Sequence, residues 1–597
     1  MNPSFLFVNA KKLPFKGYIF QGLERELLLS PQEKGSEILD QYFLELEGHI
    51  KRGLYALGYL TYELGYLLED RLKGIYRNPK LPLAYFALFR EIKPINLPVI
   101  EDGEDFEIHF KGLNQCFPEY QRSIEKIRDY IAQGDTYQVN YTVKLKFHFS
   151  GNPFNLFQRL IFSQRCEYAF FIERPQFVIL SLSPELFLQK KGDLLISAPM
   201  KGTIRRAFNL EEDILAKKYL KKDIKNQAEN LMIVDLIRND LGRVSVPGSV
   251  WVKKLFQVKT YPTLHQMIST VEGKIEGFSL KRIFQALFPC GSVTGAPKIR
   301  TMEIIRELET EPRGIYTGAL GFITPKGDFL FNVAIRTLHL NPLGGDLYQG
   351  ELGIGAGILW DSSAEAEYDE TLLKSHFLLK PLPPFKIFET LWWSKERENP
   401  HLELHYHRLR SSARYFGFPL PKELRTFRAF REFLSESLGN KKEGLHRVKV
   451  LLCPDKGLEM EIKVLEKLHW EKPIRVGLLR RKDKPSLFHF HKTTLREEYN
   501  QAYATARDLG LTEVLFYNER GELLEGSISN LFLEKDDTLY TPPTYLGILP
   551  GTLRKRLLLE GKAKEAIITL DDLRSGGILW IGNSLRGLGK VEEWVIL

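Results

Sequence analysis

Apolar residues in the first 380 positions occur mostly as short runs, and stretches with helical periodicity separate these runs. The runs are rich in β-branched and aromatic residues, which is typical of strands. A helix is predicted at 124–133, where Gly134 and Asp135 stop it, and a longer helix at 213–241. Many short strands with helices between them predict a large α+β domain built on antiparallel sheets. We predict strands at residues 58–63, 137–143, 168–172, 177–182 and 194–198, with a further pair at 316–322 and 331–337.

The pattern changes near residue 380, where the sequence Lys-Pro-Leu-Pro-Pro begins. Prolines bias this stretch toward extended conformations, so we predict a stiff, short linker at 380–385. Strands and helices alternate after it. The stretch 524–532 follows a turn that contains glycine, and the loop at 547–554 leads into a helix whose start suits an anion. We therefore predict two domains, at 1–379 and 386–597, the second of which is an α/β domain.

Candidate chemistry begins at Asp361-Ser362-Ser363, which predicts the N-cap of an acidic helix. On that helix Glu367, Glu370 and Lys374 stand at i, i+3 and i+7 and share one face. Two carboxylates beside a glycine-rich backbone and a lysine suit Mg²⁺ that bridges to a carboxylated substrate. A capped helix start in solvent would show the same pattern.

Other titratable residues stand at the ends of predicted strands and in apolar surroundings. Lys201 follows a strand, and partial burial would favour the neutral amine of a nucleophile, although most loop lysines are only solvated. Glu229 enters an apolar helical stripe, where a carboxylate must be paired or bind a cation. Arg336 is expected to point its guanidinium out of an apolar strand, as carboxylate recognition requires. Glu185 could equally be only a polar residue at the end of a strand, and His265 could equally be a histidine of the core.

Charge and cysteine usage narrow the class of protein. The net charge is +9, with 84 basic and 75 acidic residues, but no basic stripe interleaved with aromatic residues indicates nucleic-acid binding. The four cysteines lie far apart and form no CxxC, which favours a reducing compartment and excludes a structural zinc site. The N-terminus has no signal-peptide pattern, and no apolar run reaches the length of a membrane span. We expect a cytoplasmic enzyme.

With these motifs in this order, residues 1 to about 378 resemble the chorismate-utilising enzymes, the family of anthranilate synthase, isochorismate synthase and aminodeoxychorismate synthase component I. The resemblance implies that Glu229 and Glu370 hold Mg²⁺ with support from Glu367, and that His265 orients the ring of chorismate. It also implies a set of residues that bind the rest of the substrate: Thr294, Tyr316, Arg336, Gly355, Ala356, Gly357 and Lys374.

Lys201 decides which member of that family the first half resembles. Anthranilate synthases resemble this segment but carry alanine at the position, whereas Lys201 matches the aminodeoxychorismate synthase pattern. The resemblance implies that the lysine adds at ring C2 and that ammonia then enters at C4, with Glu185 as the acid for the departing hydroxyl. No cysteine lies in a Gly-x-Cys-x-Gly-x-Gln turn. We therefore expect ammonia from a separate glutamine amidotransferase subunit or from solution.

A lysine, a glutamate and two loops suited to phosphate make up the minimum set for pyridoxal phosphate in the second half. Residues 386–597 resemble the fold-type IV pyridoxal-phosphate family, which includes branched-chain and D-amino-acid aminotransferases and aminodeoxychorismate lyase. The resemblance implies Lys492 as the Schiff-base lysine and Glu525 as the partner of the pyridine nitrogen. Thr390 falls where the lyases have threonine and many aminotransferases glycine. The implied phosphate ligands are Arg408, the backbone of Thr552 and Leu553, and Asn583.

Together the two halves predict a bifunctional enzyme that converts chorismate to 4-aminobenzoate. Fold-type IV enzymes complete their sites at a dimer interface, so the resemblance also implies a homodimer held by the second half. The rival enzyme is an anthranilate synthase fused to a D-amino-acid or branched-chain aminotransferase, which Lys201 and Thr390 both disfavour. A scaffold that binds ligands without turnover is the alternative outside enzymes.

Overall fold

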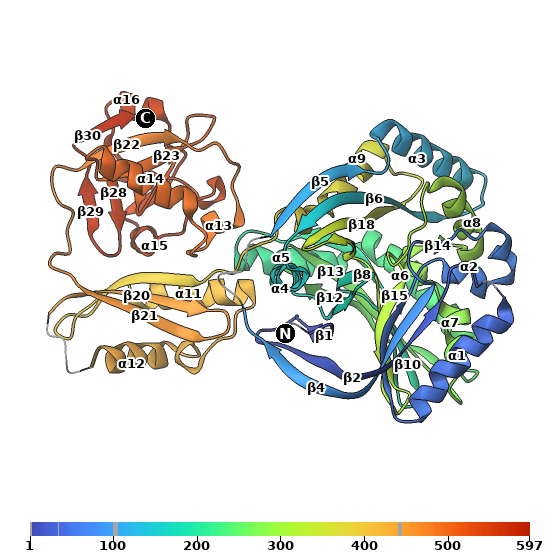
Figure 1. Cartoon of the computed structure of the whole chain (residues 1–597). Helices are drawn as coiled ribbons and strands as arrows, with labels where there is room; N and C mark the ends of the chain where they lie inside the picture. Colours follow the sequence, from blue (N-terminus) through green and yellow to red (C-terminus); the bar gives the residue numbers. More distant parts are fainter. Residues whose placement is uncertain (1–2, 34, 100–105, 440–443) are drawn as a thin grey trace. The chain divides into compact units, whose positions relative to one another are not determined.

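The computed structural model describes residues 3–33, 35–99, 106–439 and 444–597. The chain divides into two compact units, shown in Figure 1. The first unit comprises Met1–Arg206 and Leu215–Pro384, and the second comprises Ala207–Ile214 and Phe385–Leu597. The second unit thus includes a stretch of eight residues, 207–214, which the sequence places inside the first domain.

Antiparallel strand pairs build the sheet system of the first unit, which has eighteen strands in the described ranges. The longest pairings join β2 to β4 and β6 to β18, so strands far apart in the sequence lie side by side. The strands are β1 Phe5–Asn9, β2 Phe15–Leu29, β3 Tyr55–Leu60, β4 Ala84–Leu97, β5 Glu107–Leu113, β6 Gln138–Ser150, β7 Tyr168–Arg174, β8 Phe177–Ser183, β9 Leu186–Lys191, β10 Leu194–Ala198, β11 Met200–Arg205, β12 Val250–Thr260, β13 Leu264–Lys274, β14 Gly295–Ala296, β15 Ala319–Ile323, β16 Phe329–Val333, β17 Thr337–Gly344 and β18 Leu347–Ile358.

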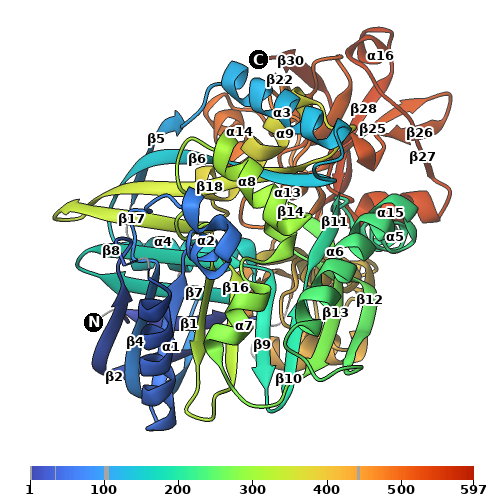
Figure 2. The same ribbon diagram turned by 90° about the vertical axis from the view of Figure 1, so that its right-hand side faces the viewer.

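Helices cover these sheets, and two of them, α6 and α9, carry residues of the site described below. The helix α6 packs against β12 and β13, as Figure 2 shows, and α9 packs against α3 and β18. The helices are α1 Ser36–Lys51, α2 Leu64–Leu68, α3 Phe117–Ala132, α4 Pro153–Gln164, α5 Leu210–Lys222, α6 Ile224–Gly242, α7 Leu280–Leu287, α8 Lys298–Leu308, α9 Ala364–Leu373 and α10 His376–Leu379, with 3-10 turns η1 Asp70–Ile75 and η2 Gly291–Val293.

Aromatic side chains dominate the core between the helices and the sheet. Phe284 of α7 lies with its ring centroid 6.0 Å from that of Phe43 in α1 and 5.3 Å from that of Phe331 in β16. All three side chains are almost completely buried. Burial of each such side chain contributes roughly 1.5–3 kcal/mol, which fixes α1 and α7 against the strands.

Two predicted elements differ from the structure. The long helix expected at 213–241 is two helices, because Asp223 leaves the helical conformation (ψ 115°) and its carboxylate caps α6 by accepting a hydrogen bond from the Asn226 backbone N–H at 2.9 Å. Arg336 was expected within a strand, but it lies between β16 and β17 with φ at 50°. Its backbone is left-handed there, so the chain turns between the two strands.

The second unit begins with a three-stranded antiparallel sheet and continues into a mixed sheet. The strands are β19 Ile387–Trp393, β20 His446–Cys453, β21 Gly457–Val464, β22 Arg475–Arg480, β23 Glu513–Tyr517, β24 Leu523–Gly526, β25 Asn530–Lys535, β26 Thr538–Thr541, β27 Ala563–Glu565, β28 Ile578–Asn583, β29 Gly587–Lys590 and β30 Glu593–Ile596. The helices are α11 Leu402–Phe416, α12 Phe427–Leu438, α13 Leu487–Phe490, α14 Glu497–Asp508, α15 Thr552–Leu559 and α16 Leu570–Arg574, with 3-10 turns η3 Lys422–Leu424 and η5 Thr544–Leu546.

These architectures confirm the predicted fold classes of both halves. The first unit combines large antiparallel sheets with helices, as an α+β domain does. In the second unit β22 runs parallel to both β23 and β30, and helices join the strands, as in an α/β domain. In the described part of the chain, each helix is too short or too polar to cross a membrane.

Candidate active sites

A β-bulge aims Lys201 out of the regular strand pairing. The register between β11 and β13 shifts between Met200 and Thr203, which leaves Lys201 and Gly202 in the irregular stretch. Gly202 has φ at 97°, and a Cβ there would lie 2.9 Å from the Asn226 side chain, so glycine is required. Asn230 of α6 donates a hydrogen bond to the Lys201 carbonyl at 3.1 Å. The helix α6 therefore holds the backbone of the bulge that carries Lys201.

Charged groups from three elements surround the Lys201 amine. Burial lowers the pKa of Lys201, and the positive charge of Lys374 acts in the same direction, whereas Glu229, Glu370 and Glu185 oppose them. A larger fraction of the amine is therefore neutral, and the neutral form is the nucleophilic one. The sequence prediction of a partly desolvated lysine agrees with this placement.

Glu185 lies in the turn between β8 and β9 and is buried. Its Oε1 accepts a hydrogen bond from Ser292 Oγ at 2.7 Å and one from the Met200 backbone N–H at 3.4 Å. Burial raises the pKa of Glu185 to about 7. A carboxyl group with this pKa carries a proton in part of the molecules at neutral pH, which suits a general acid.

The glycines Gly355 and Gly357 lie on an open edge of β18. The strand pairs with β17 only as far as Leu352 among the described residues, while β6 continues along its other edge to Ile358. Lys374 Nζ donates to the Gly355 carbonyl at 2.7 Å, so this residue directs its backbone groups to the open edge. A Cβ at Gly357 would lie 3.0 Å from Lys201 Nζ, which places the lysine tip directly over this edge.

Gln138 joins this site, although no sequence pattern singles it out. Its Nε2 lies 2.3 Å from the position that a Cβ of Gly357 would take, and its buried Oε1 has no hydrogen-bond partner within the described chain. The side chain therefore occupies the space that the missing Cβ of Gly357 leaves beside Lys201. Only a three-dimensional arrangement reveals this, because Gln138 is distant from both residues in the sequence.

The three predicted metal ligands lie on two helices. Glu229 is on α6, while Glu367 and Glu370 are on α9, whose predicted N-cap Ser363 is confirmed by its hydrogen bond from the Ala366 backbone N–H. Glu370 Oε1 lies 2.8 Å from Lys374 Nζ, and Glu367 accepts a hydrogen bond from Ser362 Oγ at 2.6 Å. In the described chain, three acidic, histidine or cysteine side chains do not converge closely enough to form a ready-made metal site.

The remaining predicted substrate residues occupy different surroundings. His265 is buried on β13, with Nδ1 3.0 Å from Thr260 Oγ1. The Thr294 hydroxyl donates to the Cys290 and Gly291 carbonyls of its own loop. Arg336 donates to Gln164 Oε1 at 2.9 Å. The loop at 289–298 contains η2 and the short strand β14, because Gly295 and Ala296 pair with β6.

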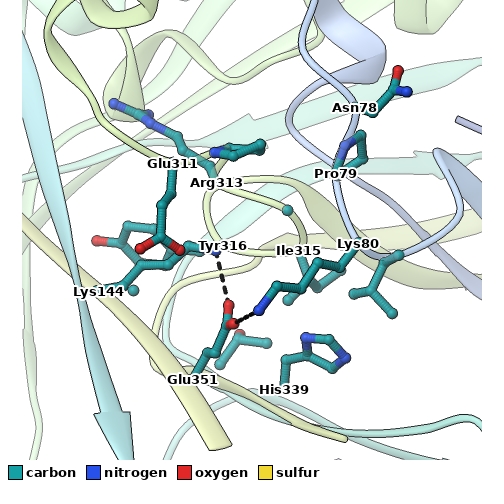
Figure 3. Close-up of a pocket in the computed structure, with 15 residues that line it drawn as sticks. Asn78, Pro79, Lys80, Lys144, Glu311, Arg313, Ile315, Tyr316, His339 and Glu351 are labelled. Atoms are coloured by element: carbon teal, nitrogen blue, oxygen red, sulfur yellow. Dashed lines mark hydrogen bonds and ion pairs between the residues drawn. The ribbon is translucent and has the colours of Figure 1, made fainter. Parts of the chain in front are cut away.

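Tyr316 lines a cavity of about 80 Å³ in the first unit, which Figure 3 shows. Its ring lies against Gly353, where a Cβ would be 2.1 Å from the ring. Glu351 lies in the cavity between Lys80 and Lys144 and pairs with both, the second at 2.9 Å. Tyr316 is thus the member of the predicted substrate set that connects this cavity with the glycine-rich strand.

In the second unit, the amine of Lys492 lies 4.9 Å from the ring centroid of Phe388 on β19. Burial lowers the pKa of Lys492 to about 7, and the charges of Arg496 and Arg408 contribute. The preceding His491 is held on both ring nitrogens, by Ser412 Oγ at 2.9 Å and by the Phe208 carbonyl at 3.0 Å. The segment 207–214 thus fixes the backbone next to the lysine. This contact was missed from the sequence.

Glu525 lies on β24 and is buried beside a tyrosine and an arginine. Tyr499 Oη donates to its Oε1 at 2.5 Å, the Leu549 backbone N–H donates to Oε2 at 3.0 Å, and Arg481 lies 4.0 Å away. Burial raises the pKa of Glu525 to about 7 against the opposing charge of Arg481. A positively charged ring nitrogen would favour the ionised carboxylate.

Arg408 forms two parallel hydrogen bonds to the carboxylate of Glu389, a residue that is 1% exposed. Its Nε and Nη2 donate to the two carboxylate oxygens at 2.7 and 2.6 Å. The same carboxylate lies 2.7 Å from His405 Nδ1. Although burial opposes it, the charge of Arg408 and the hydrogen bonds from Arg408 and His405 lower the pKa of Glu389 to about 2. Glu389 and His405 were missed because each looks like an ordinary residue of a strand or a helix.

His405 extends this network to two hydroxyl groups. Its Nε2 lies 2.9 Å from Ser584 Oγ and 3.4 Å from Thr552 Oγ1. Asn583, predicted to bind phosphate, donates from Nδ2 to the Ile528 carbonyl and accepts from two backbone N–H groups of the following turn. Its role toward phosphate stays a prediction. Thr552 and Leu553 begin α15, where backbone N–H groups have no partner within the helix.

Comparison with known proteins assigns each half of the chain to a protein family. Residues 96–380 match the family of chorismate binding enzymes, and residues 386–594 match the amino-transferases of class IV. The chain joins a chorismate-binding enzyme domain to a class IV amino-transferase domain. Both are families of enzymes, so the prediction of an enzyme and of this pair of families is confirmed.

Relatives of the chorismate-binding domain include aminodeoxychorismate synthases and an anthranilate synthase. Aminodeoxychorismate synthase component 1 is 38% identical over 272 residues in Salmonella typhimurium and 39% over 264 in Bacillus subtilis. Anthranilate synthase component 1 of Aquifex aeolicus is 36% identical over 287 residues. These matches cover 45%, 44% and 48% of this chain and 58%, 55% and 57% of the relatives. The chain thus spans little more than half the length of these relatives.

A crystal structure supports the fold of the chorismate-binding domain. Anthranilate synthase component I of Streptococcus pneumoniae superposes with a TM-score of 0.51 and is 25% identical. The superposition covers 60% of this chain and 91% of that one.

The class IV amino-transferase family implies pyridoxal phosphate, and the residues of the second unit fit it. Lys492 has an amine that is partly neutral at pH 7, and Glu525 offers a buried carboxyl group. Thr493 Oγ1 and Arg496 Nε are buried without a partner in the described chain, as polar groups that await a ligand would be. Thr390 shares a face of β19 with Phe388 and hence with the Lys492 amine.

Proposed function

We propose that the chain converts chorismate to 4-aminobenzoate in two steps, in domains at 1–379 and 386–597 joined by a linker at 380–385. The first domain replaces the C4 hydroxyl by an amino group, and the second removes pyruvate from the 4-amino-4-deoxychorismate formed. The observation that carries this proposal is Lys201, because its amine lies in a bulge over Gly357 with a lowered pKa. Relatives named aminodeoxychorismate synthase component 1 support the substrate.

In the first step Lys201 acts as a nucleophile. Its neutral amine forms a bond to C2 of chorismate while both ring double bonds shift and the C4 hydroxyl leaves. Glu185 donates the proton that converts this hydroxyl to water. Ammonia then bonds to C4, both double bonds shift back and the Lys201 amine leaves C2, and Glu185 takes the proton that the bonded ammonia loses. The ammonia comes from a separate glutamine amidotransferase subunit or from solution.

Mg²⁺ would be held by Glu229 and Glu370 with support from Glu367. Their oxygen atoms are the ligands that this ion prefers, and α6 and α9 bring them near Lys201. The ion would supply the positive charge that a dianionic substrate needs beside three carboxylates. Arg336, Tyr316, Thr294, Lys374 and the Gly355–Gly357 backbone would bind and orient the substrate, with His265 beside the ring.

In the second step the residues around Lys492 bind the cofactor and move one proton. Pyridoxal phosphate, when bound, delocalises the charge left when the substrate loses its C4 proton. Lys492 would accept that proton, and Glu525 would keep the pyridine nitrogen protonated. Arg408, Asn583 and the Thr552–Leu553 backbone would bind the phosphate. Thr390 donates a hydrogen bond to the departing enolpyruvate, and aromatisation of the ring makes its departure favourable.

The rival function is anthranilate synthesis in a chain that carries an aminotransferase. The match to anthranilate synthase component 1 of Aquifex aeolicus favours it. Lys201 and Thr390 speak against it, because a lysine nucleophile at C2 blocks the carbon at which anthranilate synthases add ammonia. We further propose that the second domain holds the chain in a homodimer, which the molar mass of residues 386–597 from light scattering would test.

Two substitutions separate the steps. Lys201→Ala should abolish amination and leave the absorbance of bound pyridoxal phosphate unchanged, since among the described residues no contact of the second site involves Lys201. Lys492→Ala should still consume chorismate but accumulate 4-amino-4-deoxychorismate. Losing a nucleophile costs several orders of magnitude in rate, so the phenotypes are distinct. Full 4-aminobenzoate synthesis by Lys201→Ala would refute the covalent step, and anthranilate from it would show amination moved to C2.

A further inference from the structure

His405 stands between an ion pair and the hydroxyl groups at the proposed phosphate site. It is 1% exposed, on α11, with Nδ1 2.7 Å from Glu389 and Nε2 2.9 Å from Ser584 Oγ. Thr552 Oγ1 lies 3.4 Å from the same Nε2. The histidine therefore connects Glu389 and its partner Arg408 to the two hydroxyl groups at the start of α15 and the end of β28.

The direction of each hydrogen bond fixes the tautomer of His405. Glu389 is ionised, since its pKa is about 2, so it can only accept, and Nδ1 must carry a hydrogen. In the neutral imidazole Nε2 then accepts, and the hydroxyl groups of Ser584 and Thr552 donate to it. In this state both hydroxyl hydrogens point at the histidine, so neither hydroxyl group can donate a hydrogen bond to a ligand.

An incoming phosphate changes this arrangement. Its oxygens are acceptors, so Ser584 and Thr552 must turn their hydrogens toward it. Nε2 would then be left buried without a donor, which costs about 1–3 kcal/mol. A proton on Nε2 removes this cost, because the imidazolium donates to Ser584 Oγ while the hydroxyl donates to the phosphate.

Charge leads to the same result. Arg408 is the predicted phosphate ligand, but Glu389 neutralises it, so the ion pair brings no net charge to a phosphate dianion. The other charged or titratable groups that face His405 are Lys492 and, at the start of the same helix, His401. Protonation of His405 would give this cluster of side chains a net positive charge, which would attract the phosphate dianion.

We propose that His405 takes up a proton when the cofactor's phosphate binds, and that it is a positioning residue for that phosphate. The inference rests on the proposed pyridoxal-phosphate site but not on the lyase reaction. Burial lowers the pKa of His405 in the free protein, which keeps the imidazole neutral until the ligand arrives.

Calorimetry on the full chain without cofactor tests this with two probes. 4-Deoxypyridoxine 5′-phosphate has the ring and the phosphate but no aldehyde, so it cannot react with Lys492; 4-deoxypyridoxine lacks the phosphate. At about pH 8 the free phosphate is already a dianion, because its second pKa is about 6. Titrations in buffers of different ionisation enthalpy give the number of protons bound. The phosphate probe should take up one proton more than the phosphate-free probe.

Variants assign the proton to its site. His405→Gln should remove the extra uptake, and Ser584→Ala should reduce it. His407→Gln, the same change at an exposed position of α11, should leave it unchanged. The ratio of the affinities of the unmodified chain for the phosphate probe and for the phosphate-free probe should fall about tenfold for each unit by which the pH is raised. A higher pH opposes the uptake of the extra proton. This measurement holds even if His405→Gln does not fold.

The outcomes separate this inference from the proposed function. Binding of the phosphate probe without extra proton uptake, or equal uptake by His405→Gln, overturns the role of His405 and leaves the lyase proposal intact. Failure of both probes to bind overturns the cofactor site itself.

Discussion

Glu389→Gln should destabilise the second unit far more than an exposed carboxylate does. The substitution keeps the size of the side chain but removes the charge that neutralises Arg408, whose side chain is 12% exposed. Removing one partner of a buried ion pair costs about 3–5 kcal/mol. Because glutamine keeps one oxygen that accepts from Arg408, we expect the lower end, about 3 kcal/mol.

Urea unfolding followed by tryptophan fluorescence measures this loss. Five of the seven tryptophans lie in the second unit, so the emission reports mainly on it. A loss of this size should lower its melting temperature by about 6–12 °C. The matched control is Glu459→Gln on β21, which removes a carboxylate that is 42% exposed and pairs with Lys386. An exposed pair contributes less than about 1 kcal/mol.

The contribution of Glu389 to stability also depends on pH. The pKa of Glu389 is lowered from 4.5 to about 2 in the folded chain. A lowered carboxyl pKa contributes stability that is fully present above 4.5 and lost as the pH falls toward 2. The difference between the unmodified chain and Glu389→Gln should therefore shrink below about pH 4.5. A loss under about 1 kcal/mol at neutral pH, equal to that of Glu459→Gln, would refute the reasoning.

Three further predictions concern the active sites. Gly357→Ala should slow chorismate consumption about a hundredfold, because its Cβ would lie 2.3 Å from Gln138 Nε2 and 3.0 Å from Lys201 Nζ. The control Gly48→Ala has open space around the new Cβ and should not slow it; equal rates for the two variants would contradict the placement of Gly357. Removing Mg²⁺ with EDTA should stop chorismate consumption but not pyruvate release from supplied 4-amino-4-deoxychorismate, and consumption unaffected by EDTA would refute the metal assignment. In the cofactor-free chain, acylation of Lys492 mapped by mass spectrometry should be half-maximal near pH 7; a midpoint near 10 would contradict its lowered pKa.

The sequence predicted the fold class and many of the elements because these depend on local patterns. Ser363 caps α9 as its place before an acidic run indicates, and the strand runs appear as strands. The errors arose where one residue changes the course of the chain. Asp223 ends one helix and caps the next within a continuous helical pattern, and Arg336 adopts a left-handed conformation within an apolar run.

The residues that support the sites were beyond the reach of sequence patterns. Gln138 meets Lys201 only through the pairing of β6 with β18, and His405 meets Ser584 across 179 positions. Glu389 stands in a strand next to Thr390, where alternation sends the two side chains to opposite faces. These contacts follow from the fold, so a single sequence contains no local feature that singles out the residues.

The product made by the purified chain tests the central claim most directly. The chain, with pyridoxal phosphate and Mg²⁺ bound, should be given chorismate and ammonium, and the products should be separated by chromatography and identified by nuclear magnetic resonance, because 2- and 4-aminobenzoate have the same mass. We predict 4-aminobenzoate and pyruvate in equal amounts. Formation of 2-aminobenzoate, or of no aminobenzoate while chorismate persists, would contradict the account.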